Sequence, residues 1–377
     1  MPIINERIFL DYLDNSKNVL LVEPLYIKKY VPLGLAKIAT YIKSKGRKIV
    51  YSRNSIVGNF DLILLTTLFS TDAKIVISTI KQLQSNLTLF HVPIIVGGIF
   101  ASLMPKYIEE KTGINIFVGC SDMLDNCLPD YSLDWQVKGF VKDSFNVFTT
   151  RGCPNKCGFC MVWKMEPSFK ILPLWKETIK KIDKEICIIS DNNLLHAPFF
   201  HIQDVVRALN KYEKKVIIDS GVDCELITKE NAKLLASLKY VRKGFRLAFD
   251  DMSQDGFYQK AMEQMIQFGL PKQGSSTTFI LFNFNDTPQD AYYRLRQSWK
   301  FKSRPYLMKF RPLNQLTKRN FYIGKYWTEN LLRVFRYYTI YFGYETMTFE
   351  KWVEYQNKEF KKNFLTDEDW QKWNFKK

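Results

Sequence analysis

The chain has 377 residues, 46% of them hydrophobic and 25% charged, which predicts an ordinary globular protein of two domains with an appendage. Its formal net charge of +17 favours polyanionic partners such as nucleic acid, nucleotides or anionic surfaces, although the dispersed lysines fit a basic, solvated surface equally well. No stretch fits a secretory signal, a transit peptide or a transmembrane helix, so we expect a cytoplasmic protein without membrane contact. The seven cysteines are then expected to be thiols or metal ligands rather than disulfides.

Strand and helix patterns alternate along the first third of the chain. Buried strands are predicted at 18–23, 48–51, 61–67 and 93–96, and helices at 33–45 and 72–84. This alternation predicts a parallel sheet with helices on both faces, a Rossmann-like domain over residues 1–140. The alternation lapses near 120–140 in a connector that contains Pro and Asp, where we place the domain boundary.

A second alternating series follows this connector. Its candidate strands are 146–150, 186–190, 216–219, 245–249 and 278–282. Successive βα units without hairpin signals predict a partial (β/α)6 TIM-type barrel over residues 141–310, with active residues at the C-terminal ends of its strands. Residues 311–377 are rich in aromatics and lysines at helical spacing, which predicts a short helical segment packed on the barrel. The predicted fold class is therefore α/β.

Three cysteines lie close together directly after the first strand of the second series. The segment Thr149 to Trp163 reads TTRGCPNKCGFCMVW and places Cys153, Cys157 and Cys160 at C-x3-C-x2-C spacing. Thiolates are the ligands that iron–sulfur clusters require, and a loop rich in Gly and Pro can bring three of them to one cluster. Three protein ligands leave one iron open, as catalysis needs, whereas four-ligand sites are typically structural.

This loop resembles the cluster loop of the radical S-adenosylmethionine (SAM) superfamily, where an aromatic residue often precedes the last cysteine, here Phe159. The resemblance implies a 4Fe-4S cluster on Cys153, Cys157 and Cys160, with SAM chelated to the open iron. It also implies reductive cleavage of SAM to a 5′-deoxyadenosyl radical, hydrogen abstraction from a substrate, and an electron donor such as flavodoxin or ferredoxin.

The resemblance further implies SAM contacts at the ends of later strands. The candidate positions are Asp191, Asn192 and Asn193 for the SAM amino group, Asp250 and Asp251 for the ribose hydroxyls, and Phe282 and Asn283 for the adenine. Carboxylates and amides can accept hydrogen bonds from an ammonium group and from hydroxyls. Asp and Asn are also routine helix caps and turn residues, and capping by Asp251 or Ser253 fits the fourth unit equally well.

The first domain resembles the cobalamin-binding domain that precedes many radical SAM barrels, on the segments PLGLAKIATYIKSKG and VGGIFASLMP. The family's cobalt-ligating motif, D-x-H-x-x-G, does not occur in this sequence. The loop after Glu23 carries Tyr26, Lys28 and Lys29 instead, so we expect a degenerate domain that does not bind cobalamin tightly as a cofactor. Overall the chain is similar to uncharacterised phage and bacterial radical SAM proteins, with which it shares TTRGCP, DNN, FDD and FNDTP in this order.

Three classes of function stay open. A radical SAM enzyme acting on nucleic acid or a nucleotide is favoured by the charge of +17 and by aromatics interleaved with lysines in the tail. The second class is a radical SAM enzyme acting on a peptide or small metabolite. The third is a non-catalytic iron–sulfur or zinc-binding protein, with Cys187 or His196 as a remote zinc ligand. The scattered cysteines, Cys120, Cys127, Cys187 and Cys224, are expected to be buried thiols.

Overall fold

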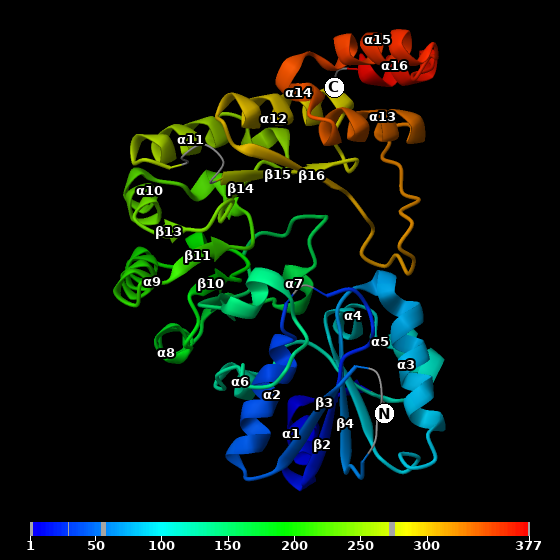
Figure 1. The fold of residues 1–377 in the computed structure, drawn as a ribbon, viewed down its shortest axis with the longest axis vertical. Helices are drawn as coiled ribbons and strands as arrows, with labels where there is room; N and C mark the ends of the chain where they lie inside the picture. The colour runs from blue at the N-terminus through cyan, green and yellow to red at the C-terminus, as the bar shows by residue number, and fades with distance from the viewer. Residues whose placement is uncertain (1–2, 29, 54–57, 271–275, 376–377) are drawn as a thin grey trace. The chain divides into compact units, whose positions relative to one another are not determined.

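The computed structural model describes residues 3–28, 30–53, 58–270 and 276–375. The chain forms two compact units: unit 1 comprises residues 1–187 and 312–320, and unit 2 comprises residues 188–311 and 321–377. Both units contain parallel sheets flanked by helices, which confirms the α/β class (Figure 1). The functional boundaries that we placed at 140 and 310 stay predictions.

Unit 1 is built on a six-stranded parallel sheet with the order β1-β6-β5-β4-β2-β3. Its strands are β1 (Ile3–Ile4), β2 (Asn18–Val22), β3 (Lys48–Ser52), β4 (Leu62–Thr67), β5 (Ile94–Gly98) and β6 (Asn115–Phe117). The order of β3-β2-β4-β5-β6 is that of flavodoxin-like doubly wound sheets. The order reverses between β2 and β4, and sheets of this kind bind ligands beyond the carboxyl ends of the strands at that point.

Helices cover both faces of this sheet. They are α1 (Glu6–Asn15), α2 (Leu33–Ser44), α3 (Ala73–Ser85), α4 (Ile99–Leu103), α5 (Pro105–Thr112) and α6 (Asp122–Asp125). Neighbouring residues of one strand enter different cores: Leu20 packs with Val76 and Ile80 of α3, whereas Leu21 packs with Leu35 of α2. Because successive side chains alternate between faces, a sheet covered on both sides needs continuous apolar strands, which explains runs such as NVLLV.

The loop after β2 is held by buried charges. The Glu23 carboxylate is 2% exposed; it pairs with the Lys28 ammonium and accepts a hydrogen bond from the Tyr51 hydroxyl at 2.6 Å. Lys28 also donates to Tyr51 Oη at 2.8 Å and to the Trp135 carbonyl at 2.5 Å. The loop thus uses Lys28 for internal pairing, and Lys29 lies outside the described residues. The expectation that this domain does not bind cobalamin stays a prediction.

The rest of unit 1 consists of short elements around the cysteine loop. They are the 3-10 helix η2 (Gly139–Asp143), β7 (Ser144–Val147), β8 (Thr150–Arg151), α7 (Val162–Met165), β9 (Lys170–Ile171) and α8 (Trp175–Lys181). β7 neighbours β10 (Ile186–Ile189), whose first two residues belong to this unit. The returning segment 312–320 is held by the Ser70 hydroxyl, which hydrogen-bonds the carbonyls of Leu313 and Gln315, each at 2.9 Å.

Unit 2 continues from β10 with two groups of strands. The first has the order β13-β11-β10, with β11 (Lys215–Ile218) and β13 (Lys239–Tyr240) parallel. The second is parallel, with the order β12-β14-β15-β16, formed by β12 (Val222–Asp223), β14 (Phe245–Ala248), β15 (Ser276–Phe282) and β16 (Arg304–Lys309). β11 and β14 contact each other and so connect the two groups.

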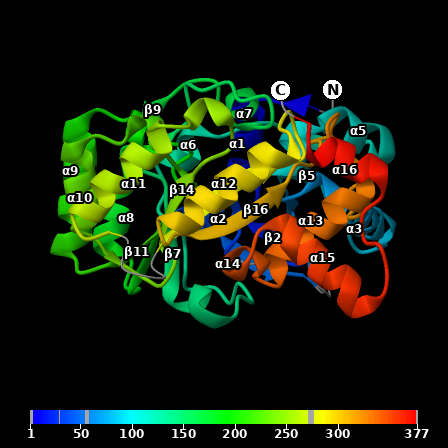
Figure 2. The same ribbon diagram turned by 90° about the horizontal axis from the view of Figure 1, so that it is seen from above.

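Helices follow most strands of unit 2. The longer ones are α9 (Phe199–Lys211), α10 (Lys229–Ala236), α11 (Phe257–Gln267) and α12 (Pro288–Lys300), and the 3-10 turns are η3 (Leu194–His196), η4 (Cys224–Leu226) and η5 (Met252–Gln254). The tail forms α13 (Glu329–Ile340), α14 (Gly343–Thr346), α15 (Phe349–Phe360) and α16 (Asp367–Trp373), which pack with α12 and β15 (Figure 2). The helical C-terminal segment is therefore present.

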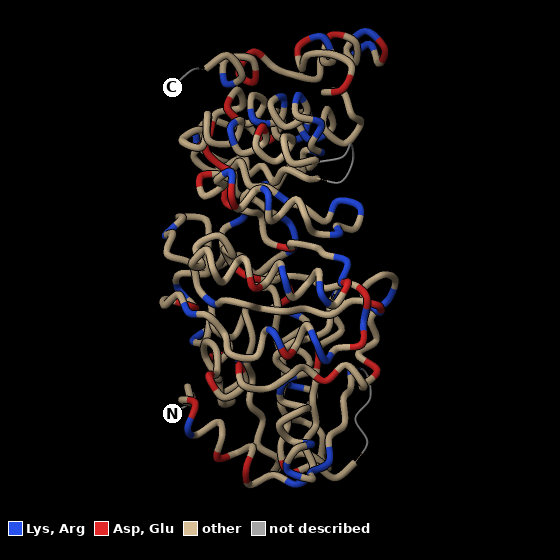
Figure 3. The backbone as a smooth tube through the Cα atoms, turned by 90° about the vertical axis from the view of Figure 1, so that its left-hand side faces the viewer, with Lys and Arg blue, Asp and Glu red and all other residues tan. Residues whose placement is uncertain are grey.

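Two further expectations concern the whole chain. Within the described ranges, no helix combines the length and the apolar character needed to cross a bilayer. Lys and Arg lie along the entire chain, interleaved with Asp and Glu, rather than in one tract (Figure 3). The charge of +17 therefore predicts a local binding surface only where cations gather without acidic partners.

Candidate functional site

The three clustered cysteines lie in a loop of unit 1 whose base is closed by a short antiparallel ladder. β8 pairs with β9 through Thr150 with Ile171 and Arg151 with Lys170. The Leu172 amide also donates to the Thr149 carbonyl at 2.9 Å. Residues 152–169, which include α7, therefore form a loop whose two ends lie side by side at this ladder.

Gly152, the first residue of the loop, passes very close to the returning chain. Its φ of +77° is a conformation that favours glycine, and a Cβ here would lie 2.4 Å from the Ser168 carbonyl oxygen. The Gly152 amide donates to Glu166 Oε2 at 2.8 Å. Only glycine fits at this position without a shift of the backbone. The glycine of the RGCP sequence is therefore needed for steric reasons, whereas the cysteine after it is expected to have a chemical role.

A network of buried charges holds the base of the loop. Arg151 donates to Glu166 Oε1 at 3.2 Å and to Asp125 Oδ1 at 3.4 Å. Asp125 also pairs with Lys37 at 3.1 Å and with Lys170 at 3.4 Å. Burial alone would raise the pKa of the Asp125 carboxyl, but Arg151 and Lys37 outweigh burial and hold this pKa below its ordinary value. The carboxylate is thus charged at neutral pH and fixes α6 to the loop.

The side chains of Cys153, Cys157 and Cys160 are all half-buried. The Cys160 amide donates to the Cys157 carbonyl at 3.0 Å, which forms a turn between the second and third cysteines. The Val162 amide donates to Cys160 Sγ at 3.4 Å, and the Trp163 indole donates to the Cys157 carbonyl at 3.2 Å. Amide hydrogen bonds to sulfur stabilise thiolates, the form in which cysteine binds metals. Phe159, between the last two cysteines, is half-buried.

The donor set of this loop fits an iron–sulfur cluster by its chemistry. It offers three thiols and an amide directed at one sulfur. Within the described ranges, however, no three His, Cys, Asp or Glu side chains are gathered in a geometry that could hold a metal ion. The backbone is therefore shaped into a loop, while its cysteine side chains are not gathered as ligands.

The other cysteines differ in exposure. Cys187 and Cys224 are buried, Cys127 is half-buried and Cys120 is exposed, so the expectation of a buried thiol is wrong for Cys120. Cys120 Sγ lies 3.6 Å from Glu166 Oε1. The connector therefore reaches the base of the cysteine loop through Cys120 as well as Asp125, an approach that has no local sequence signal.

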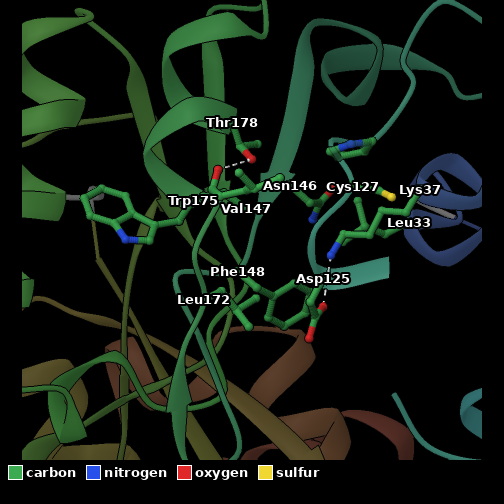
Figure 4. Close-up of a pocket in the computed structure, with 12 residues that line it drawn as sticks. Leu33, Lys37, Asp125, Cys127, Asn146, Val147, Phe148, Leu172, Trp175 and Thr178 are labelled. Atoms are coloured by element: carbon green, nitrogen blue, oxygen red, sulfur yellow. Dashed lines mark hydrogen bonds and ion pairs between the residues drawn. The ribbon is translucent and has the colours of Figure 1, made fainter. Parts of the chain in front are cut away.

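A small cavity lies beside the Lys37–Asp125 ion pair (Figure 4). Its volume is about 20 Å³, and its lining includes Leu33, Cys127 and Trp175. This volume accommodates about one water molecule. The cavity is therefore too small for a nucleoside or an amino acid.

In unit 2, the predicted SAM contacts after β10 are largely buried. Asp191 is 2% exposed and Asn193 is 7% exposed, whereas Asn192 is half-buried. The Asn193 amide donates to Asp223 Oδ2 at 3.3 Å. Asp191 and Asn193 also line a cavity of about 10 Å³ together with Ser220. Polar side chains from the ends of β10 and β12 are thus brought together.

The acidic pair after β14 is engaged within unit 2. Asp250 Oδ1 accepts a hydrogen bond from the Leu281 amide at 2.9 Å, and burial raises the pKa of Asp250 to about 6. Asp251 caps η5, where its side chain accepts from the Ser253 amide at 2.9 Å. The capping alternative for Asp251 is therefore observed. Sequence reasoning missed Arg294, which is fully buried and donates to the carbonyls of Asp250 at 2.6 Å and Leu281 at 2.7 Å.

Phe282 and Asn283, at the end of β15, are also used internally. The Phe282 ring packs against Trp327 at a centroid distance of 5.6 Å. Asn283 is fully buried, has a φ of +65°, accepts from the Gly324 amide at 2.8 Å and donates to the Tyr322 carbonyl at 3.1 Å. These side chains connect β15 to the segment before α13.

Comparison with models of known protein families gave no match, and comparison with curated proteins gave no significant match. Any proposal of function for this chain therefore rests on its own residues and on the resemblance of its cysteine loop.

Proposed function

We propose that this protein is a radical SAM enzyme in which Cys153, Cys157 and Cys160 hold a 4Fe-4S cluster. When bound, the cluster supplies the electron that splits the sulfonium of SAM and releases a 5′-deoxyadenosyl radical for hydrogen abstraction. The observation that carries the proposal is one loop with three half-buried thiols, closed at its base by β8 and β9. An electron donor such as flavodoxin or ferredoxin completes the system.

The chain's own residues have defined tasks in this proposal. The three thiols act as thiolates, and the Val162 amide stabilises the charge on Cys160 through its hydrogen bond of 3.4 Å. Glu166 accepts from the Gly152 amide and from Arg151, so the strand that enters the loop is fixed directly before Cys153. Such support by residues behind the ligands orients a metal site and tunes its affinity.

For the fold, we propose that the strands β7, β10, β11, β14, β15 and β16 belong to a partial (β/α)6 TIM-type barrel. The parallel registers of β14 with β15 and of β15 with β16 support this assignment, as does the contact between β11 and β14. The sheet of unit 1 then corresponds to a degenerate cobalamin-binding-like domain, with Glu23 and Lys28 pairing in the loop after β2.

For SAM, we propose contacts from Asp191, Asn192 and Asn193. They follow β10 directly and combine a carboxylate with two amides, which can receive an ammonium group. Asp250 is the next candidate, because the hydrogen bond from the Leu281 amide occupies only one of its two carboxylate oxygens, Oδ1. Asp251, Phe282 and Asn283 are weaker candidates, since their side chains already cap η5 or join β15 to the tail.

The substrate class that we propose is a nucleic acid or nucleotide, supported by the net charge of +17.

The experiment that decides whether the protein is a radical SAM enzyme is anaerobic reconstitution with iron and sulfide. Iron counting follows, and then mass spectrometry of 5′-deoxyadenosine after reduction with dithionite. We expect about four irons per chain and SAM cleavage. Replacing any one of Cys153, Cys157 or Cys160 with Ala should abolish cleavage.

The matched control is Cys127→Ala, a half-buried cysteine outside the loop, which should retain iron and SAM cleavage. Zinc at stoichiometric occupancy without iron uptake would refute the proposal. Iron loading that survives in all three loop variants would refute the ligand assignment.

A further inference from the structure

The aromatic tail divides into buried and exposed rings. Seven of its rings form the core between the tail helices, β15 and α12: Trp327, Phe335, Tyr338, Tyr344, Phe349, Trp352 and Trp373. Three rings at the C-terminal end of α13 remain on the surface: Tyr337 is 41% exposed, Tyr341 70% and Phe342 44%. Tyr337 and Tyr341 lie one helical turn apart with ring centroids separated by 6.2 Å. The Phe342 ring lies 6.0 Å from the core ring of Tyr344, whereas packing of the core does not account for Tyr337 and Tyr341.

Phe342 combines a partly exposed side chain with an unfavourable backbone conformation. It follows the end of α13 with a φ of +55°, in the left-handed region where glycine or asparagine is preferred at the end of a helix. The next residue, Gly343, cannot carry a side chain, because a Cβ would lie 2.5 Å from the Tyr338 ring. A large aromatic ring thus occupies a position where a small or polar residue would cause less strain.

One cation lies near this ring, and two further cations lie near that cation. The Arg304 guanidinium lies 5.8 Å from the centre of the Phe342 ring. Arg242 and Lys243 lie in the turn before β14, where burial and the charges of Arg304 and Arg242 together lower the pKa of Lys243. These three cations form no ion pair in the part of the chain that the structure describes. An acidic side chain, Glu345, also lies in this region: its charge raises the pKa of Tyr344, whereas the charge of Arg304 lowers it.

We infer that Arg242, Lys243, Arg304, Tyr337, Tyr341 and Phe342 form a binding surface for single-stranded nucleic acid, the basic-aromatic patch. Exposed rings offer faces on which unpaired bases stack, and cations without acidic partners neutralise phosphates. The bases of a duplex are already stacked, so the patch selects single strands. This inference goes beyond the proposed function, because it needs neither the cluster nor SAM.

The test is fluorescence anisotropy of the full-length protein with a labelled single strand of roughly 12 nucleotides. The double variant Tyr341→Ala/Phe342→Asn should weaken binding at least about tenfold, the value expected for one lost base stack. Arg304→Gln should weaken binding and reduce its salt dependence. Tyr355→Ala removes a ring of α15 that is 54% exposed and should leave affinity unchanged.

Two further measurements separate binding from folding and from the cluster. Phe342→Asn alone should leave Tm unchanged or higher, since Asn tolerates positive φ, while it weakens binding. Cys157→Ala should bind the strand as well as the wild type does, so failure of the cluster proposal would not affect this result. The inference would be overturned by equal affinity for single strand and duplex, or by a loss of affinity in Tyr355→Ala as large as that in the double variant. Retention on phosphatidylserine vesicles without oligonucleotide binding would also overturn it.

Discussion

Glu166 closes the cysteine loop onto Arg151: the guanidinium donates to Oε1 at 3.2 Å, while the amide of Gly152 donates to Oε2 at 2.8 Å. One carboxylate therefore binds both the side chain and the backbone of the strand that enters the loop. The side chain of Glu166 is only 13% exposed, so water does not readily replace it. The loop is thus shaped by contacts among protein residues.

The first prediction is that Glu166→Ala lowers both stability and iron uptake. The substitution leaves the Gly152 amide without its acceptor and Arg151 without one of its two carboxylates, which should lower the free energy of unfolding by about 1–3 kcal/mol. Urea denaturation and iron counting after reconstitution measure the two effects. Glu177→Ala, which removes an exposed pair with Lys181, is the control and should change neither. Full iron content in Glu166→Ala would show that the network does not support the site.

The second prediction concerns steric closure at Gly152. Gly152→Ala should destabilise the protein and disturb the loop, because the new Cβ would meet the Ser168 carbonyl oxygen at 2.4 Å. Gly113→Ala is the matched control: its φ of +66° is similar, yet nothing lies within 4 Å of its Cβ. Both variants share the backbone strain of positive φ, about 1 kcal/mol. The difference between their unfolding free energies therefore measures the cost of the contact between the new Cβ and Ser168. Equal losses of unfolding free energy in the two variants would contradict a tight contact.

The parallel α/β architecture was predictable because both faces of the unit 1 sheet are covered. Strands such as β2 and β4 are then apolar along their whole length, and this pattern is visible without coordinates. The network below the cysteine loop was not predictable. Asp125 and Arg151 are 26 residues apart, and nothing local marks the connector carboxylate as the partner of the loop arginine.

The aromatic tail shows a second limit of sequence reasoning. Tyr337 is 41% exposed and its neighbour Tyr338 is fully buried, although both belong to the run of aromatic residues from which the helix was predicted. The direction of α13 relative to its core decides which ring is buried, and that direction depends on distant residues such as Leu295 of α12. Periodicity predicts the helix but not the orientation of its aromatic face.

The third prediction concerns SAM recognition. Asp191→Ala and Asp250→Ala should each weaken SAM binding by about 1–3 kcal/mol while iron content stays intact, the range for a lost charge-assisted hydrogen bond. Isothermal titration of cluster-replete protein measures the affinity. Asp251→Ala removes the η5 cap and should affect stability more than SAM affinity. Unchanged affinity in both Asp191→Ala and Asp250→Ala would mean that these residues serve only the fold.

The fourth prediction follows from the buried carboxyl of Asp250, whose pKa burial raises to about 6. An unfolded Asp titrates near pH 4, so between about pH 4 and pH 6 the folded state holds the proton more tightly than the unfolded state. The contribution of Asp250 to stability is therefore greatest below about pH 4 and declines as the pH rises to about 6.

Asp250→Asn tests this prediction, because it keeps an oxygen acceptor for the Leu281 amide but does not titrate. Relative to this variant, the wild type should lose on the order of 1–3 kcal/mol of unfolding free energy between pH 4.5 and 7.5, measured by urea denaturation of the metal-free protein. A difference that stays constant across this range would show that Asp250 titrates as an exposed carboxyl does, and an opposite sign would show that Arg294 outweighs burial.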